Sequence, residues 1–234
     1  IVEKYNLHDY AKPMVGRSVQ VSSVIFNKKD WELNSKSGAK AHFLKFPEIQ
    51  NINGNKSALG YIKFGEKQEI HKGYKCGLRD EWQIVPSTRI SDALFIRRNN
   101  LFPRLIINEA QVYTTDTMHR VWIKENVDIK TFAASYYNSL SLAFAEICGR
   151  SHGGGVLELM PNEVENIILP YNEKNAVLLD EIDIRMRNKE NINKILEQTN
   201  KLILKNNLGF SDTDIKLANS IREKLATRRL NRGK

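Results

Sequence analysis

The segment from Asp128 to Gly149 restricts the possible folds more than any other part of this sequence. Its large apolar residues recur every three or four positions, as they do along one face of an α-helix. These residues are Phe132, Tyr136, Leu140, Phe144 and Ile147. Asp128 occupies the position of an N-terminal cap, and Gly149 stands where a left-handed residue often ends a helix. We predict one long helix over residues 128–148, packed against the rest of the chain.

Three consecutive glycines follow this helix, in the stretch GRSHGGGVLELMP at residues 149–161. A glycine loop that binds nucleotide phosphates lies between a strand and a helix and matches GxxxxGK[ST] or GxGxxG. This loop follows a helix and matches neither pattern, which favours a turn over a cofactor site. Glycines also let a backbone approach a partner closely. Arg150, Ser151 and His152 would then lie at the rim of the turn.

Short extended segments predominate before residue 125, and each is bounded by Gly, Pro, Asn or Asp. The predicted strands lie within residues 40–46, 73–79, 81–85, 92–98, 104–110 and 117–124. Two short helices are expected between them, KKDWELNSKSG after Asn27 and SALGYIKFGEKQ with Ser57 as its cap. Strands combined with a long packed helix predict an α+β fold, a strand-rich domain over residues 1–170.

After Pro170 the sequence pattern becomes helical. NINKILEQTNKLIL carries its apolar residues on one face, and Gly209 then interrupts the pattern. Ser211 and Asp214 form a capping box at the start of a last helix. The side chains expected to face inward on this helix are Leu217, Ile221 and Leu225. We predict a helical C-terminal region over residues 171–234, appended to the first domain.

The positive charge of the chain is concentrated in two zones. The formal net charge is +9. Residues 71–104 hold seven Lys/Arg and three Asp/Glu, and residues 171–234 hold 14 Lys/Arg and nine Asp/Glu, while the remainder is balanced. A polyanion is the natural partner of such zones, although a solvated basic surface has the same composition. Arg228, Arg229 and Arg232 are also favoured by the dipole of the helix that they end.

Reactive groups are present, but not in a catalytic arrangement. Cys76 and Cys148 are the two cysteines, which gives neither a zinc-site spacing nor a disulfide framework and favours a reducing cytoplasm. No GxSxG motif occurs, and the histidines are scattered.

No apolar run approaches the roughly 20 residues of a membrane span, and no signal peptide is evident. We expect no catalytic residue, metal or cofactor in this chain. Because it begins at Ile1, we expect further protein upstream.

Five stretches form a specific combination: DYAKPMVGRSVQV, IHKGYKCGLRDEWQIVPS, ISDALFIRRN, RRNNLFPRLIINEAQVYTTDTMHRVWIKE and YYNSLSLAFAEICGRSHGGGVLELMPNEVENIILP. Together they resemble the C-terminal target-recognition region of bacterial N6-adenine DNA methyltransferases from type II restriction-modification systems, in which the catalytic domain comes first. The resemblance covers residues 8–171.

The resemblance implies a recognition domain without its catalytic partner. Such enzymes transfer a methyl group from S-adenosylmethionine to a flipped adenine, and their catalytic motif is Asn-Pro-Pro-Tyr or a near variant. No two of the six prolines in this chain are adjacent. The catalytic and S-adenosylmethionine-binding domain is therefore expected upstream, with that domain and double-stranded DNA as partners. The fragment alone is expected to be inactive.

The residues expected to contact DNA lie on or beside the basic strands and at the rim of the glycine turn. They are Lys72, Lys75, Arg79, Arg89, Arg97, Arg98, Arg104, Asn108, Thr115, His119, Arg120, Arg150, Ser151 and His152. Lys and Arg supply phosphate contacts, while Arg and Asn also read base edges. Successive strand side chains face opposite ways, so Arg97 and Arg98 are not both expected in one groove. For Arg120, the alternative to a DNA contact is an ion pair inside the protein.

Two other functions stay open. A nuclease-related segment needs clustered acidic ligands followed by Lys, and only Asp80–Glu81 and the reversed Lys124–Glu125 come near this pattern. A subunit-docking domain would use the amphipathic region 171–234 and touch DNA only incidentally. An uncovered apolar face on that region would favour docking.

Overall fold

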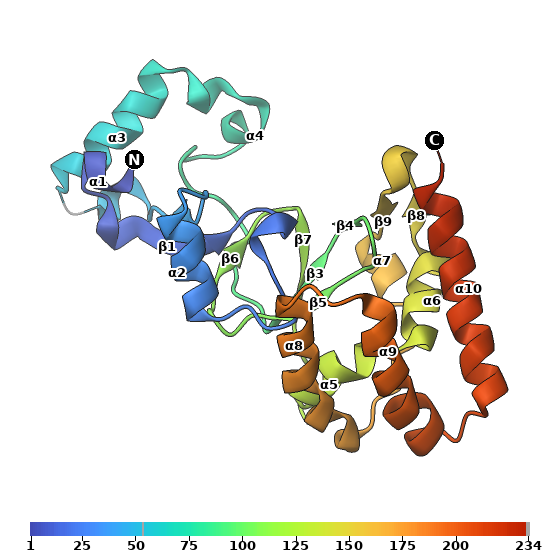
Figure 1. Ribbon diagram of the computed structural model, residues 1–234. Coiled ribbons are helices and arrows are strands. Elements are labelled where there is room, and N and C mark those ends of the chain that lie inside the picture. The colour runs from blue at the N-terminus through green and yellow to red at the C-terminus, as the bar shows by residue number, and fades with distance from the viewer. Residues whose placement is uncertain (53, 233–234) are drawn as a thin grey trace.

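Helices and strands are mixed along the chain, and the predicted α+β fold is confirmed (Figure 1). The computed structural model describes residues 1–52 and 54–232. Within these residues the strands form three three-stranded sheets. Their strand orders are β2-β1-β6 (His42–Leu44, Ala11–Val15, Tyr113–Thr114), β5-β3-β7 (Leu105–Ile107, Ala93–Ile96, Met118–Val121) and β4-β9-β8 (Arg98–Asn99, Leu157–Glu158, Arg150–Ser151). The pair β1–β6 is parallel, and the other pairs are antiparallel.

The helices lie around these sheets. They are α1 (Val2–Tyr5), α2 (Lys28–Lys36), α3 (Lys56–Lys67), α4 (Tyr74–Gly77), α5 (Ile129–Tyr136), α6 (Ser139–Cys148), α7 (Pro161–Val164), α8 (Leu179–Arg187), α9 (Ile192–Asn200) and α10 (Asp212–Leu230). A π-helical segment, Lys201–Asn207, extends α9. Helices α1, α3 and α4 form an arm at one end of the molecule, and α8, α9 and α10 lie toward the other end (Figure 1). Among the described residues, no helix has the length and apolarity needed to cross a bilayer.

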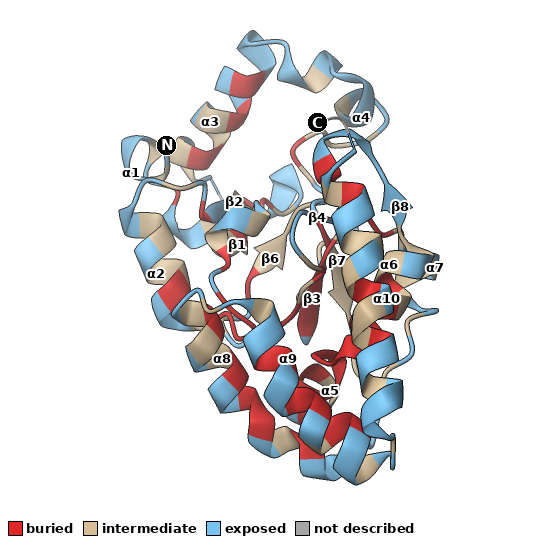
Figure 2. Ribbon diagram, turned by 45° about the vertical axis from the view of Figure 1, so that its right-hand side comes forward, coloured by how far each residue is buried: buried red, intermediate tan, exposed pale blue. Residues whose placement is uncertain are grey.

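Strand β3 separates two hydrophobic cores. Ala93 and Phe95 enter a large core that also contains residues of α5, α6, α8 and α9, whereas Leu94 and Ile96 enter a smaller core on the opposite side. Alternate side chains of a strand point to opposite faces, and β3 is therefore buried along its whole length (Figure 2). A third core, around Phe46, supports the arm.

The single helix predicted over residues 128–148 is wrong, because the chain breaks between α5 and α6. Asn138 is fully buried, and its Oδ1 accepts a hydrogen bond from the Ser141 backbone N–H at 2.9 Å, which caps a new helix. Gly149 is not left-handed, since its φ is −81°. Its lack of a side chain matters for a different reason: a Cβ there would lie 2.7 Å from Leu157 Cδ1.

Two of the predicted strands are also wrong. Residues 73–79 contain the helical turn α4, in which the Gly77 backbone N–H donates to the Gly73 carbonyl oxygen at 2.8 Å. Residues 81–85 form a turn, with the Ile84 N–H donating to the Glu81 carbonyl oxygen. The other four segments each contain strand residues. The cap of α3 is Asn55 rather than Ser57, because the Asn55 side chain accepts from the Ala58 N–H.

The C-terminal helices contribute buried side chains to the large core. The capping box of Ser211 and Asp214 at the start of α10 is confirmed. Of the three residues predicted to face inward on α10, Leu225 is half-buried, while the other two are exposed. Leu217 and Ile221 are 59% and 38% exposed, while the residues buried on α10 are Ala218, Arg222 and Arg229. Helix α10 packs on α6 (Figure 1).

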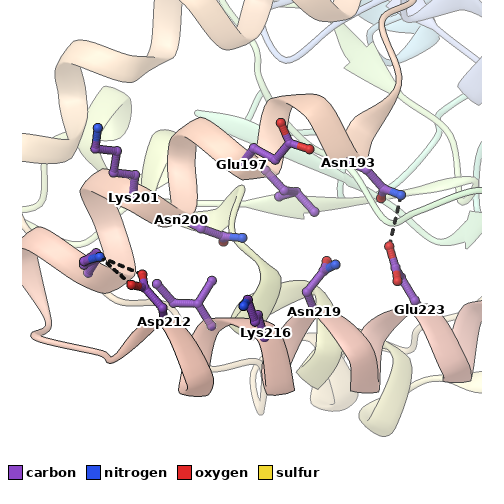
Figure 3. A pocket seen from close by; sticks show the side chains of 11 residues that line it. Asn193, Glu197, Asn200, Lys201, Asp212, Lys216, Asn219 and Glu223 are labelled. Atoms are coloured by element: carbon purple, nitrogen blue, oxygen red, sulfur yellow. Dashed lines mark hydrogen bonds and ion pairs between the residues drawn. The ribbon is translucent and has the colours of Figure 1, made fainter.

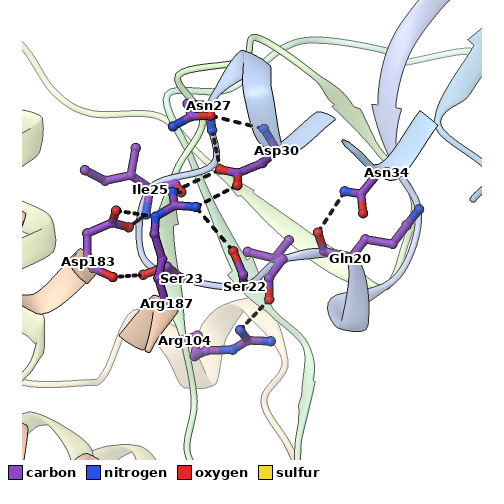
Figure 4. Close-up of polar contacts among 11 residues, drawn as sticks. Gln20, Ser22, Ser23, Ile25, Asn27, Asp30, Asn34, Arg104, Asp183 and Arg187 are labelled. Atoms are coloured by element: carbon purple, nitrogen blue, oxygen red, sulfur yellow. Dashed lines mark hydrogen bonds and ion pairs between the residues drawn. The ribbon is translucent and has the colours of Figure 1, made fainter. Parts of the chain in front are cut away.

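Arg187 joins α8 to the N-terminal half of the chain (Figure 4). Its guanidinium binds both carboxylate oxygens of Asp30, at 2.6 and 3.0 Å, and donates from Nε to Asp183 at 2.6 Å. The hydrogen bonds to Asp30, followed by those to Asp183, raise the pKa of Arg187 above its ordinary value. Residues far apart in sequence are therefore joined by a charged contact as well as by apolar packing.

Candidate nucleic-acid interface

A row of charged side chains crosses the sheet β4-β9-β8. Arg98 and Arg150 are both register partners of Glu158, which lies on the central strand between them. Directly opposed residues of neighbouring antiparallel strands project from the same face of a sheet. The sheet therefore places two arginines on one face, on either side of a carboxylate.

Glu158 holds several basic groups together. Its Oε1 accepts from Arg98 Nε at 3.0 Å and lies 2.9 Å from Arg97 Nη2, while its Oε2 lies 2.9 Å from His152 Nε2. The Glu158 side chain is 9% exposed, whereas the side chains of Arg98 and His152 are 67% and 51% exposed. Arg150 is 61% exposed and contacts Glu163 at 2.6 Å. Arg98, Arg150 and His152 are therefore fixed at one end and open to solvent over much of their surface, whereas the side chain of Arg97 is 27% exposed.

The pKa of Glu158 is lowered from its ordinary value of 4.5, chiefly by the hydrogen bond from Arg98 and then by the charges of Arg98, Arg97 and His152. A carboxyl whose pKa is depressed in the folded state contributes stability above its unfolded pKa and loses it as the pH falls through the folded pKa. Glu158→Gln is expected to lower the urea midpoint at pH 7, and the difference from wild type should shrink progressively below pH 4.5. The same titration of the exposed Glu165→Gln variant serves as control. A difference that stays constant from neutral to acid pH would contradict this role of Glu158.

The glycine turn is confirmed as a turn and is packed against the end of α10. Gly154 and Gly155 have φ values of +69° and +73°, in the left-handed region that favours glycine. A Cβ on Gly155 would lie 3.1 Å from Leu230 Cα. Arg229 donates to the Gly155 carbonyl oxygen and, at 2.6 Å, to the Asn100 carbonyl oxygen. The turn that carries His152 is thus held by a buried arginine.

The end of α10 extends the basic surface. Arg228 and Arg232 are exposed, and with Ser151 and Leu157 they line a cavity of about 200 Å³. We call the combined set the basic sheet surface: Arg97, Arg98, Arg150, His152, Arg228 and Arg232. Arg228 and Arg232 were not among the residues predicted to contact DNA, although the basic C-terminal zone was the signal that pointed to them.

The second group of predicted residues lies on and near the arm. Lys72, Lys75 and Arg89 are exposed, and Lys72 contacts Glu69 at 2.6 Å. Arg79 is half-buried and donates from Nη1 to the Trp82 carbonyl oxygen at 3.0 Å. The arm and the C-terminal end of α10 both lie at the top of the view in Figure 1, the arm on the left and α10 on the right.

Two predicted DNA contacts need correction because the side chains are used inside the protein. Arg104 donates to the Val21 carbonyl oxygen at 2.7 Å and to the Ser18 carbonyl oxygen at 3.0 Å, and burial lowers its pKa. Asn108 is 1% exposed and closes a turn by donating to the Val112 carbonyl oxygen and accepting from the Val112 N–H. Neither side chain can reach a groove without disrupting its own contacts.

Three more predicted residues make internal hydrogen bonds while staying half-exposed. Thr115 Oγ1 donates to the Gly16 carbonyl oxygen at 3.0 Å, and His119 Nε2 lies 2.7 Å from the Leu159 carbonyl oxygen. Arg120 donates to the Ser87 carbonyl oxygen and lies over the ring of Trp122, so its internal partners are a carbonyl and an aromatic ring in place of the ion pair weighed from the sequence. Their contacts with DNA stay a prediction.

A larger groove lies elsewhere, between α9 with its π-helical extension and α10 (Figure 3). Its volume is about 460 Å³, and its lining is mixed. Lys205 and Asp212 pair at one end, and Asn193 donates to Glu223 at the other. None of the predicted DNA-contact residues lines this groove. The basic sheet surface is therefore the site that the sequence-predicted residues assemble.

The chain belongs to a family of methyltransferase C-terminal domains. Residues 1–204 match the family model described as the type II methyltransferase M.Eco57I, C-terminal domain, which confirms the resemblance seen in the sequence. The fold is also similar to a solved structure, described as that of the type IIG restriction endonuclease BpuSI, with a TM-score of 0.59 and 15% identity. That alignment covers 97% of this chain and 27% of the BpuSI chain. The comparison with curated proteins gave no match.

Proposed function

We propose that this chain is the DNA target-recognition domain of a site-specific adenine-N6 DNA methyltransferase in a restriction-modification system. The observation that supports this function is the basic sheet surface, in which the exposed guanidinium of Arg98 and the half-buried guanidinium of Arg97 are fixed by the buried Glu158. Methyl transfer from S-adenosylmethionine would belong to a separate upstream domain of the same protein. That domain and double-stranded DNA are the proposed partners.

The spacing of Arg98 and Arg150 suits a DNA groove. Neighbouring strands lie about 4.8 Å apart, so two residues on the outer strands of a three-stranded sheet are separated by about 10 Å. The major groove of B-DNA is about 12 Å wide and admits a β-ribbon. Arg98 and Arg150 would therefore enter one groove together, while Arg228 and Arg232 contact a phosphate backbone beside it.

A second candidate function, docking of another protein segment, is favoured by one observation. Leu217 and Ile221 are four residues apart on α10 and leave an apolar face exposed. Such a face would suit contact with the rest of a methyltransferase. The nuclease alternative gains no support, because no three His, Cys, Asp or Glu side chains in the described residues are grouped to hold a metal ion.

Binding of the 234-residue chain to duplex DNA is expected to weaken steeply as salt rises, because it rests on phosphate contacts. The double variant Arg98→Ala/Arg150→Ala should reduce the slope of log K against log salt by about 0.9 for each phosphate contact that the substitutions remove. An arginine that reads a base should instead relax sequence preference by about 1–3 kcal/mol. Fluorescence anisotropy with labelled duplexes at several salt concentrations measures both effects.

The matched control for this experiment is Lys130→Ala/Lys194→Ala, which removes two exposed charges from α5 and α9. Its binding should equal that of wild type. Equal losses in the two double variants would mean that net charge alone governs binding. No salt-dependent binding by the wild-type chain would refute the proposed function.

A further inference from the structure

The tip of the arm exposes apolar side chains to an unusual degree. This arm tip, residues 70–79, reads IHKGYKCGLR and contains α4. Ile70, Tyr74 and Leu78 are 50%, 83% and 72% exposed. Single exposed apolar residues are common on protein surfaces, but here three of them fall within ten residues. Tyr74 and Leu78 are four positions apart, which places them on one side of a helical turn.

The charge of the arm tip indicates what kind of partner would cover these side chains. Lys72, Lys75 and Arg79 lie in the same ten residues, and the carboxylate of Glu69, just before them, pairs with Lys72 at 2.6 Å. Lysine is depleted in protein–protein interfaces, whereas DNA offers phosphates to cations and base faces to apolar groups. Proteins that bend DNA insert apolar side chains between base pairs from the minor groove. The composition of the arm tip therefore fits duplex DNA better than a protein surface.

The arm tip is firmly attached to α3. The ring of Trp82 lies directly on Gly65, where a Cβ would come within 2.4 Å of the Trp82 Cη2 atom. Trp82 Nε1 also donates to Glu66 at 3.4 Å, and Arg79 donates to the Trp82 carbonyl oxygen at 3.0 Å. Trp82 in turn packs against the core of the arm. A tip held in this way can press into a base stack without folding back.

We propose that the arm tip is an apolar wedge, in which Tyr74 and Leu78 enter the minor groove and part a base step while Lys72 and Lys75 contact phosphates beside it. This inference rests on the proposed DNA binding and adds distortion of the duplex to it. An opened step lowers the cost of unpairing its neighbours, which favours extrusion of a base for modification. In this proposal the arm deforms the DNA duplex, while the basic sheet surface recognises its sequence.

The wedge is tested with the 234-residue chain and duplexes of about 30 base pairs that carry a fluorophore at each end. Wild-type protein at saturation should raise energy transfer between the ends, because the kink brings them closer. Tyr74→Ala/Leu78→Ala should abolish this rise and weaken binding about five- to tenfold, with the salt slope unchanged. Lys72→Ala/Lys75→Ala should show the reverse, a smaller salt slope with the kink retained.

Val177→Ala/Ile184→Ala is the matched control, because it removes two side chains that are 76% and 59% exposed from α8 and the turn directly before it, outside the arm. It should bind and bend DNA like wild type. Gly65→Ala, which displaces Trp82, should reduce bending while Tyr74 and Leu78 remain in the sequence. Binding without any change in energy transfer, or normal bending by Tyr74→Ala/Leu78→Ala, would overturn the wedge alone. Absence of DNA binding by wild type would overturn the proposed function as well.

Discussion

A chain that ends at Pro170 is expected to lose its cooperative unfolding transition. Residues after Pro170 supply eight of the buried apolar side chains of the large core: Leu178, Leu179, Ile182, Met186, Ile195, Leu196, Ile203 and Leu204. Burial of each such side chain contributes about 1.5–3 kcal/mol. Their combined loss exceeds the net stability of most domains, about 5–15 kcal/mol. Near-ultraviolet circular dichroism and urea titration of the 1–170 chain measure the effect.

The control for this truncation is supplied by the missing segment itself. Co-expression of residues 171–234 with residues 1–170 should restore a soluble complex, since the separate segment carries the side chains that complete the large core. A 1–170 chain that unfolds cooperatively on its own would contradict the expectation. It would also support the division into two domains at residue 170, which stays a prediction.

Replacement of Arg229 by methionine is expected to destabilise the fold by about 3–5 kcal/mol, the usual loss when one partner of a buried ion pair is removed. Arg229 and Glu146 have side chains that are 2% and 4% exposed, and their closest N–O distance is 2.7 Å. The substitution leaves the Glu146 carboxylate and the carbonyl oxygens of Asn100 and Gly155 without their donor. Urea midpoints of the variant and wild type give the difference.

Arg228→Met is the matched control for this substitution, because the neighbouring Arg228 is exposed. A surface change of this kind is expected to alter stability by no more than about 0.5 kcal/mol. Glu146→Leu/Arg229→Met should recover much of the loss, since replacing both partners leaves no uncompensated charge. Equal midpoints for Arg229→Met and Arg228→Met would show that the buried pair contributes no stability.

Local sequence rules predicted those features that depend on neighbouring residues. Asp128 and Ser211 cap helices as expected, because a cap needs only backbone groups three residues further along. The break at Asn138 was not predicted, although its cap on the Ser141 N–H is equally local, because the continuous apolar periodicity favoured one helix and a distant contact also holds the break. Asn200 accepts a hydrogen bond from the Ser139 N–H at 2.8 Å and lies 61 positions away. The apolar residues keep their helical spacing across such a break, so periodicity alone does not reveal it.

The candidate site was predictable in composition but not in assembly. Arg98, Arg150 and His152 were chosen because they are basic and lie near strands or the glycine turn. Glu158 was not chosen, although it binds both Arg98 and His152. Its contact with Arg98 depends on strand pairing between residues some 60 positions apart. Asn108 shows the converse error. Its amide suits adenine in principle, but a buried turn uses the same donors and acceptors.

The two-sided burial of β3 has a consequence for chimeras built from related chains. The side chains of this strand are buried in both cores. Arg97 and Arg98 follow it directly in the chain. In a chimera whose junction falls within residues 93–99, both cores would be built partly from one parent chain and partly from the other. Their side chains would then not be matched for packing. Grafts that preserve function must therefore transfer β3 together with the packing on both of its faces, and crossover points belong in the loops outside it.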